Sequence, residues 1–330
     1  MANFPSSPGV SLNELDTTFI TGTPVSVGAA IIGPTVKGPV EIPMIVTSYS
    51  DYKNRFGGSF ISGSDTYSYL TSLAAYNYFV EGGESLLVAR VVSGTYSQAT
   101  SSIISNGLDA TSSSFALETL SEGIIMNSSG TLAADGALSN GTSDNVRWEI
   151  SSVNTGSGTF NVIVRRGDDR TNDKTVLESF NSVNLDPNST RYIAKVIGDQ
   201  VVTYDSVNNQ IDIITGSFAN ASRYVRVTDI SPTPNYLDNS GIAKSEYTSS
   251  IPIQGSGSFG GALGQIAGDA KFYNEISSTD SQGLVEGDYT NMVDLLSNVN
   301  DYQFNILSTP GLTNIDHTST VSSIISNTIQ

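Results

Sequence analysis

Residues 25–92 constrain the fold more tightly than any other stretch of the chain. They contain a near-continuous apolar run at 25–32, a shorter one at 41–47, two segments with helical features, and a third apolar run at 85–92. Such runs are typical of strands buried on both faces, and their alternation with helices is typical of α/β domains. We therefore predict the first part of an α/β domain here and place its second part beyond residue 245.

Glycine, proline and capping residues divide this stretch into elements. Gly33-Pro34 and Gly38-Pro39 break the chain twice. Ser48, with Asp51 three residues later, predicts a helix start, and Gly57-Gly58 predicts its end. A longer helix is predicted from Ser64 or Asp65 to Glu81.

The predicted long helix has an apolar face and neighbouring tyrosines. The face comprises Leu70, Leu73, Ala74, Asn77 and Val80, with Tyr69 and Tyr76 beside it. Residues at this spacing line one side of a helix. We expect these side chains to pack in a core or an interface rather than to bind a ligand.

From residue 96 the chain becomes rich in serine, threonine, asparagine and glycine, and its apolar runs become short. Strands are predicted at 114–120, 146–152, 159–165, 176–185, 200–204, 211–215 and 224–227, with a helix at 191–197. The strands at 146–152 and 159–165 flank a Gly-Ser-Gly turn and predict a hairpin. We predict a mostly β domain inserted into the α/β domain.

The α/β pattern returns near the end of the chain. A helix is predicted at 288–298, a buried strand at 304–307 and a helix at 318–329, without the strand that α/β alternation would supply next. The predicted fold is thus mixed α+β and α/β, with a discontinuous core whose C-terminal part is missing. The predicted divisions are an arm at 1–24, core parts at 25–95 and 246–330, and the insertion at 96–245.

Composition excludes several classes of function. The 330 residues include 15 basic and 32 acidic side chains, for a net charge of −17, which disfavours direct binding to nucleic acid. Cysteine is absent, so disulfides and thiolate chemistry are excluded. The single histidine leaves little room for zinc sites or histidine-based triads. No apolar run is long enough to span a membrane, and the first 20 residues lack the features of a secretory signal.

One glycine pattern admits an enzymatic interpretation. Gly255, Gly257 and Gly260 satisfy G-x-G-x-x-G, and Glu275 and Asp280 follow near the spacing of a ribose-binding acid. However, Pro252 weakens the preceding strand, and no second βα unit follows. A flexible loop is the favoured interpretation, and nucleotide binding is the alternative.

Other candidate sites carry weaker signals. Asp168, Asp169 and Asp173 could supply oxygen ligands to calcium, but basic residues lie among them, so we predict a solvated, internally paired loop. The single histidine, His317, is expected at the surface. N-x-[ST] sequons at Asn127, Asn140, Asn188 and Asn220 are interpreted as chance matches. No catalytic, metal or cofactor site is predicted.

The N-terminal arm shows a short alternation of apolar and polar residues. The alternation is carried by Val10, Ser11, Leu12, Asn13, Glu14 and Leu15. Such a segment can be disordered, or it can add a strand to the sheet of another chain.

Several motifs, taken in order, resemble the tail sheath proteins of contractile-tailed bacteriophages, especially T4-like viruses of marine hosts. They are Pro8-Gly9-Val10 with Glu14; Ala29-Ala30-Ile31-Ile32-Gly33-Pro34; Lys37-Gly38-Pro39; Val46-Thr47-Ser48 with Asp51-Tyr52 and Phe56-Gly57; Tyr78-Phe79-Val80-Glu81-Gly82-Gly83 with Val88-Ala89-Arg90-Val91; Leu185-Asp186-Pro187-Asn188-Ser189; and the glycine-rich loop at 255–261. Sheath proteins usually continue further, so the resemblance implies a truncated or shortened chain.

The resemblance implies a structural, non-enzymatic role in a virion. Sheath subunits stack as hexameric rings around a tail tube, exchange strands through terminal arms, and contract to drive the tube through the host envelope. It implies partners in other copies of the chain, the tube protein, and baseplate and terminator proteins, with assembly in the host cytoplasm and no cofactor. It also assigns the arm at residues 10–15 to strand addition.

Three alternatives remain open. The chain could serve a related contractile system, such as a bacteriocin or a type VI secretion particle. It could be a nucleotide-binding α/β enzyme that uses residues 255–260. It could also be a β-rich surface or adhesion module.

Overall fold

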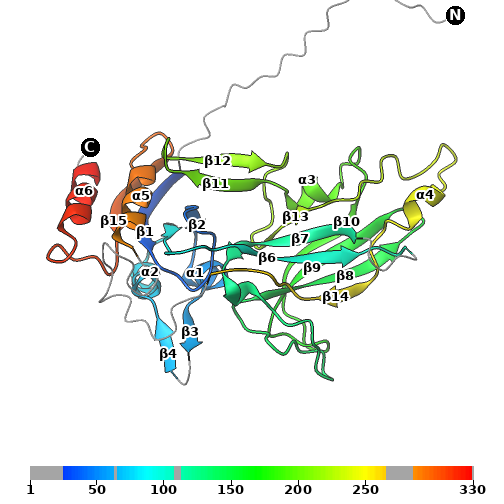
Figure 1. The fold of residues 1–330 in the computed structure, drawn as a ribbon, viewed down its shortest axis with the longest axis horizontal. Coiled ribbons are helices and arrows are strands. Elements are labelled where there is room, and N and C mark those ends of the chain that lie inside the picture. The colour runs from blue at the N-terminus through cyan, green and yellow to red at the C-terminus, as the bar shows by residue number, and fades with distance from the viewer. Residues whose placement is uncertain (1–24, 63–64, 108–112, 265–284, 329–330) are drawn as a thin grey trace, which may run out of the picture.

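The computed structural model describes residues 25–62, 65–107, 113–264 and 285–328. Figure 1 shows an elongated molecule with a helix-flanked sheet at one end and a β-rich region at the other. The fold is mixed α/β, as predicted. The arm, and with it the predicted strand-addition residues, lies outside the described residues.

The sheet at the first end has the strand order β15-β1-β5-β2, with bounds Tyr302–Ser308, Val25–Gly33, Leu86–Arg90 and Met44–Val46. β15 and β5 both run parallel to β1, whereas β2 runs antiparallel to β5. The sheet therefore pairs the first described strand with the last one, from opposite ends of the chain (Figure 1).

Helices cover both faces of this sheet, as the continuous apolar runs predict. Ala29 and Ile31 of β1 pack in a cluster with α1 (Tyr49–Phe56) and α2 (Leu70–Val80). Ala30 and Ile32 pack in another cluster with α5 (Glu286–Leu296). Helix α6 (Thr318–Thr328) lies against α5, where Glu286 accepts a hydrogen bond of 2.6 Å from the Thr320 hydroxyl.

Capping places α1 where the sequence predicts it. The Ser48 side chain accepts a hydrogen bond of 3.0 Å from the Asp51 N–H. Gly57 ends the helix with a φ of +78°, a conformation that favours glycine. The prediction of both ends is confirmed.

The predicted start of the second helix at Ser64 or Asp65 is wrong. A hairpin of β3 (Ser59–Ser62) and β4 (Asp65–Ser68) occupies that region, and α2 begins at Leu70 without a side-chain cap. The Phe60 ring packs against Tyr67 and Tyr69, with ring centroids 5.6 and 5.5 Å apart. This aromatic packing outweighs the local capping signal.

The β-rich region is a sandwich of two sheets. One has the order β10-β9-β8-β14, with bounds Val176–Asn184, Thr159–Arg166, Val146–Asn154 and Gly255–Gly257. The other has the order β13-β7-β6, with bounds Val225–Thr228, Ser113–Glu122 and Gln98–Ile104. Phe115 of β7 stacks on Phe160 of β9, with ring centroids 5.7 Å apart, so the inner faces share one core.

Smaller elements complete this region: η1 (Ile124–Met126), α3 (Ile193–Ile197) and α4 (Ser245–Thr248). β6 was not predicted, because its serine and threonine residues conceal an alternation in which Ala99 and Ile103 are buried.

Residues beyond 245 also belong to the core of the sandwich. Ile251, Phe259 and Ala262 are buried in it, and β14 pairs with β8. The predicted division between residues 245 and 246 therefore separates segments that pack together.

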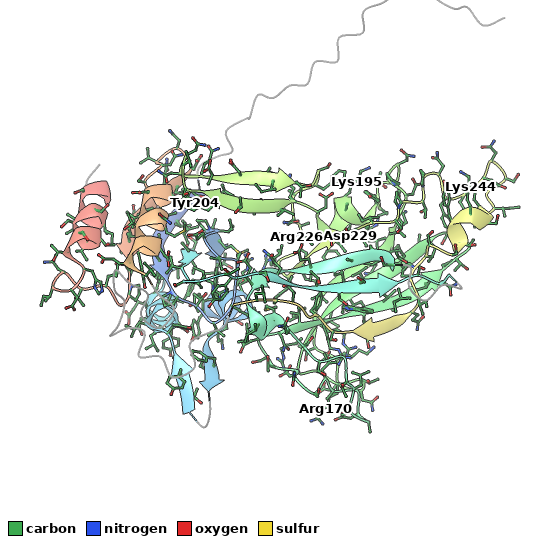
Figure 2. The ribbon with its side chains drawn as sticks, viewed as in Figure 1. Arg170, Lys195, Tyr204, Arg226, Asp229 and Lys244 are labelled. Carbon is green, nitrogen blue, oxygen red and sulfur yellow. The ribbon has the colours of Figure 1, made fainter. Side chains whose placement is uncertain are left out.

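A two-stranded ribbon extends from the β-rich region back to α5. It consists of β11 (Val201–Asp205) and β12 (Gln210–Thr215) (Figure 1). The Tyr204 hydroxyl donates a hydrogen bond of 3.1 Å to the Asn291 carbonyl of α5, and the position of Tyr204 near α5 can be followed in Figure 2. Two-stranded ribbons are marginally stable alone, so this anchoring holds the ribbon in place.

Buried charges lie where the two regions meet. Arg90, 1% exposed at the end of β5, donates hydrogen bonds of 2.6 Å to the Gly38 carbonyl and 3.0 Å to the Glu122 carbonyl at the end of β7. Lys37 donates a hydrogen bond of 2.8 Å to the Asp144 carbonyl, and burial lowers its pKa to about 8. These bonds connect the helix-flanked sheet to the sandwich.

Glu122 makes the stability of this junction depend on pH. Burial raises its pKa from 4.5 to about 7, although the positive charges of Arg90 and Arg226 oppose the rise. Because the folded state holds a proton that the unfolded state releases, stability falls as pH increases from about 4.5 to 7.

We expect Glu122→Gln to remove this loss of stability with rising pH. At pH 8 the free energy of unfolding of the variant should exceed that of the wild type by at least about 1 kcal/mol. The two proteins should differ less at pH 5. Urea unfolding at both pH values checks this prediction, and an equal difference at both would contradict it.

Candidate assembly interface

β15 is an open edge of the helix-flanked sheet. Within the described part of the chain it pairs with β1 alone. An edge strand presents unpaired N–H and C=O groups to which another strand can bind. Ile306, in the middle of this strand, is 60% exposed.

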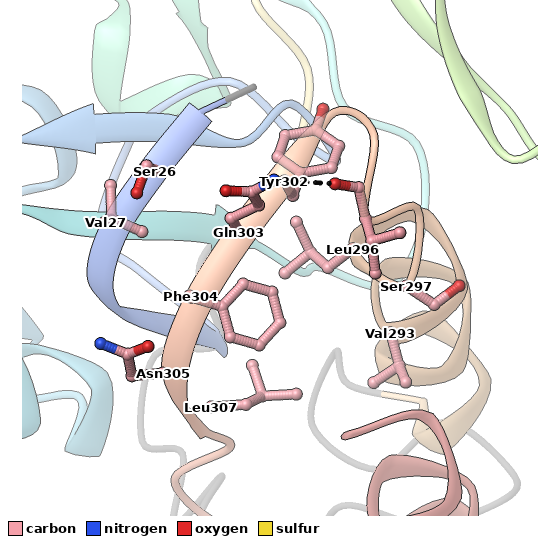
Figure 3. Close-up of a pocket in the computed structure, with 11 residues that line it drawn as sticks. Ser26, Val27, Val293, Leu296, Ser297, Tyr302, Gln303, Phe304, Asn305 and Leu307 are labelled. Carbon is pink, nitrogen blue, oxygen red and sulfur yellow. Dashed lines mark hydrogen bonds between the residues drawn. The ribbon is translucent and has the colours of Figure 1, made fainter. Parts of the chain in front are cut away.

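A groove of about 340 Å³ lies beside this edge, between β15 and the end of α5 (Figure 3). Val293 and Leu296 line it from the helix, and Phe304 and Leu307 line it from the strand (Figure 3). Polar side chains line it as well, among them Ser297, Asn305 and Gln303, whose amide donates a hydrogen bond of 3.4 Å to the Val299 carbonyl. The groove is therefore partly apolar and partly polar.

Exposed apolar side chains on β15 and on the segments before and after it extend the candidate surface. They are Val299, Ile306, Ile315 and Ile325, with exposures of 62%, 60%, 91% and 52%. The sequence offers no direct signal for them, because an apolar residue in a strand or helix usually predicts burial. Their exposure is visible only in the fold.

The glycine pattern at 255–260 lies in a sheet. Residues Gly255–Gly257 form β14, which pairs antiparallel with β8. A Cβ at Gly257 would lie 2.3 Å from the ring of Trp148, so the indole requires glycine there. No helix begins between residues 258 and 264, and the strand-to-helix turn of a nucleotide-binding loop is therefore missing from this described segment. The acids Glu275 and Asp280 lie outside the described residues.

The acidic loop is internally paired, as predicted, but its centre is buried rather than solvated. Asp169 is 3% exposed and accepts two hydrogen bonds of 2.7 Å from Arg165. Arg147 lies 3.3 Å from the same carboxylate, and Arg165 also reaches Glu149 at 2.8 Å. Asp168 pairs with Arg166 near the surface. Asp169 thus serves a structural ion-pair network, whereas Asp173 exchanges backbone hydrogen bonds with Arg170.

His317 is buried, with 5% of its surface exposed, which corrects the predicted surface position. Its Nδ1 accepts a hydrogen bond of 3.1 Å from the Thr313 N–H, and its backbone N–H donates to the Thr313 carbonyl. These bonds form the turn before α6. The histidine is therefore a structural residue at a helix start.

Two of the sequon asparagines have internal roles. The Asn127 side chain exchanges hydrogen bonds with the backbone of Ala262, and the Asn220 amide donates to the Gln200 carbonyl. Asn140 and Asn188 are exposed.

Within the described ranges, no group of three or more His, Asp or Glu side chains is placed to hold a metal ion. No helix there is both long and apolar enough to cross a membrane.

Comparisons with known proteins give structural similarities only. No protein-family model and no curated protein matches the chain. A sheath tail protein from Listeria innocua is similar over 92% of this chain and 45% of its own length, with 12% identity and a TM-score of 0.44. A sheath tail protein from Desulfitobacterium hafniense is similar over 99% of this chain and 61% of its own length, with 12% identity and a TM-score of 0.30. The chain spans about half the length of these structures.

Proposed function

We propose that the chain is a subunit of a bacteriophage contractile tail sheath, a structural protein without enzymatic activity. Copies polymerise as stacked hexameric rings around a tail tube and contract to drive the tube through the host envelope. The tube protein and the baseplate and terminator proteins are its other partners. The sequence resemblance to sheath proteins and the open β15 edge beside its groove support this proposal.

The edge suits a linkage between copies. We propose that the alternating segment at residues 10–15 of one copy adds a strand to β15 of another, with Val10 and Leu12 toward the apolar part of the groove. Main-chain hydrogen bonds supply affinity in such contacts, and pockets for alternate side chains supply specificity. A strand held in this way keeps subunits connected while they rotate during contraction.

Electron microscopy of the purified chain tests the function. Over a range of protein and salt concentrations, we expect striated hollow tubes or rings. A chain that stays monomeric at every concentration would overturn the sheath assignment.

Deleting residues 1–20 is expected to leave a folded monomer and to abolish tubes at concentrations where the wild type forms them. The physical reason is the loss of the added strand at every subunit contact. Circular dichroism checks the fold, and microscopy checks assembly. Equal assembly by the deletion variant would remove the arm from the proposal.

Paired substitutions within the arm provide a matched control. Val10→Lys with Leu12→Lys changes one side of the alternating segment, whereas Ser11→Lys with Asn13→Lys adds the same charge on the other side. Because successive side chains of a strand point to opposite faces, we expect the first pair to block assembly more strongly. Equal effects of the two pairs would indicate that the segment does not bind as a strand.

A further inference from the structure

Helix α2 exposes three of its large apolar or aromatic side chains, whereas three of its small side chains are buried. Thr71, Ser72 and Ala75 face the protein and are 2% exposed or less. Leu73, Tyr76 and Val80 face outward, with exposures of 48%, 47% and 61%. An ordinary surface helix buries its large apolar side chains. Of the side chains predicted from the sequence to pack in a core or an interface, Leu73, Tyr76 and Val80 face outward, whereas Tyr69 is buried and Ala74 packs against the core.

Close packing on β1 explains the small inward residues. A Cβ at Gly33 would lie 2.3 Å from the Thr71 hydroxyl oxygen, and one at Gly28 would lie 2.4 Å from the Tyr78 hydroxyl. At Gly33 the helix approaches the strand through the small Thr71 side chain, whereas at Gly28 the larger Tyr78 side chain fills the space that a Cβ would need. Leu73, Tyr76 and Val80 take no part in this contact, so the subunit's own core does not account for them.

The outward residues form one ordered patch. Their spacing of three and four residues aligns them along one side of the helix. The ring of Tyr76 contacts that of Tyr49 edge-on, with centroids 5.1 Å apart, and Tyr49 stacks on the buried Tyr52 at 5.9 Å. Tyr49 also shares a hydrogen bond of 3.2 Å with Ser72. Side chains held in this way lose little conformational entropy on binding.

The patch carries no charge, although the chain is strongly acidic. The sequence of α2, LTSLAAYNYFV, contains no ionisable acid or base other than its tyrosines. Two copies of a chain with a net charge of −17 repel each other, and like charges brought together at a contact cost several kcal/mol. A surface without charges is where two such copies can approach, whereas a cationic partner would select the acidic surface instead.

We propose that the outward face of α2, formed by Leu73, Tyr76 and Val80, packs against a second copy of this chain. This inference rests on the proposed self-assembly and adds a second contact to the one at β15. The bulky apolar side chains supply the area that is removed from water. The nearest charges are Lys53, whose Nζ lies 5.2 Å from the centroid of the Tyr49 ring, and Glu81, which directly follows Val80.

Leu73→Glu tests this contact, with Leu132→Glu as the matched control. Both leucines are 48% exposed, and Leu132 lies in a loop of the β-rich region. We expect Leu73→Glu to raise the concentration needed for assembly at least tenfold, and the control to change it less than twofold. Light scattering against protein concentration measures both, and circular dichroism checks the fold.

The assembly of Leu73→Glu and of the wild type distinguishes failure of the α2 contact from failure of the proposed function. Tubes formed by Leu73→Glu at the wild-type concentration would overturn the α2 contact and leave the sheath assignment intact. A wild-type chain that never associates would overturn both.

Thiol labelling supplies a second measurement, because the chain contains no cysteine. In Val80→Cys we expect a maleimide to react quickly in dilute protein and at least tenfold more slowly after assembly, while Leu132→Cys reacts equally in both states. Slow labelling of Val80→Cys in the dilute monomer would show that the chain covers its own α2 face. Fast labelling after assembly would show that no second copy covers it. Either result overturns the proposal.

Discussion

Asp169→Ala is expected to destabilise the β-rich region by about 3 to 5 kcal/mol, a large fraction of the total stability of an ordinary domain. The Asp169 carboxylate holds Arg165 at 2.7 Å and Arg147 at 3.3 Å. All three side chains are at most 3% exposed, so removing the carboxylate leaves two guanidinium groups buried without their shared anion. The carboxylate also accepts a hydrogen bond of 3.1 Å from the Thr175 N–H, which the substitution breaks as well.

Asp168, the residue before Asp169, provides the control substitution. Asp168 is 34% exposed, and its partner Arg166 is 42% exposed, so solvent screens their ion pair. We expect Asp168→Ala to change stability by less than about 1 kcal/mol. Urea unfolding of the full chain, followed by the fluorescence of Trp148 on β8, measures both variants. Equal losses of stability would contradict the view that the buried network supports the sandwich.

Asp169→Asn distinguishes the contribution of the negative charge to stability from that of the hydrogen bonds. The amide keeps one oxygen acceptor but removes the negative charge between Arg147 and Arg165. We expect a loss of stability close to that of alanine, because two buried cations then lie together with only Glu149, which pairs with Arg165 at 2.8 Å, as a counter-charge. A loss of less than about 1 kcal/mol would show that hydrogen bonding alone maintains the site.

The sequence predicts the parts of this fold in which local signals agree with packing. The run that becomes β1 is apolar at every packed position, and the structure buries Ala29 and Ile31 on one face and Ala30 and Ile32 on the other. Helix α1 carries its own start and stop signals at Ser48 and Gly57. Both elements depend on features that lie within a few residues of each other.

The remaining features depend on contacts between distant segments. The β3–β4 hairpin replaces a predicted helix start because aromatic rings pack across it, and residues 255–257 form a strand because β8 provides a partner. Asp169 lies in the loop after β9, and its buried position depends on Arg147 of β8. Local patterns cannot report such pairings.

The candidate interface was the hardest part to predict. A helical repeat of apolar residues indicates a packed face, but it does not distinguish packing within a chain from packing between chains. In α2 the contact with β1 is made by Thr71 at Gly33 and by Tyr78 at Gly28. Part of the apolar pattern, at Leu73, Tyr76 and Val80, is left on the outer surface of this helix.

Ile306→Lys is expected to block assembly at the sheet edge without affecting the fold. Ile306 lies in the middle of β15 and is 60% exposed, so the monomer should lose less than about 0.5 kcal/mol. Lysine on an edge strand opposes the pairing of another strand, and natural proteins use it for that purpose. We expect the concentration required for tubes to rise at least tenfold.

Ile242→Lys is the matched control for this substitution. Ile242 is 65% exposed and lies in a loop of the β-rich region, so the same charge is added away from any sheet edge. We expect its assembly to remain within twofold of the wild type. Tubes formed by Ile306→Lys at the wild-type concentration would contradict a role for the β15 edge.

Combining variants distinguishes the two proposed contacts. If the arm of one copy binds to β15 of another, deleting residues 1–20 and substituting Ile306→Lys disrupt the same contact. The double variant should then assemble little worse than the more severe single variant, because substitutions that share one interaction are not additive. Leu73→Glu acts at the separate α2 face, so its effect should add to that of Ile306→Lys. If the effects of the deletion and of Ile306→Lys were additive, the arm would bind somewhere other than β15. If the effects of Leu73→Glu and Ile306→Lys were not additive, the α2 face and the β15 edge would belong to one contact.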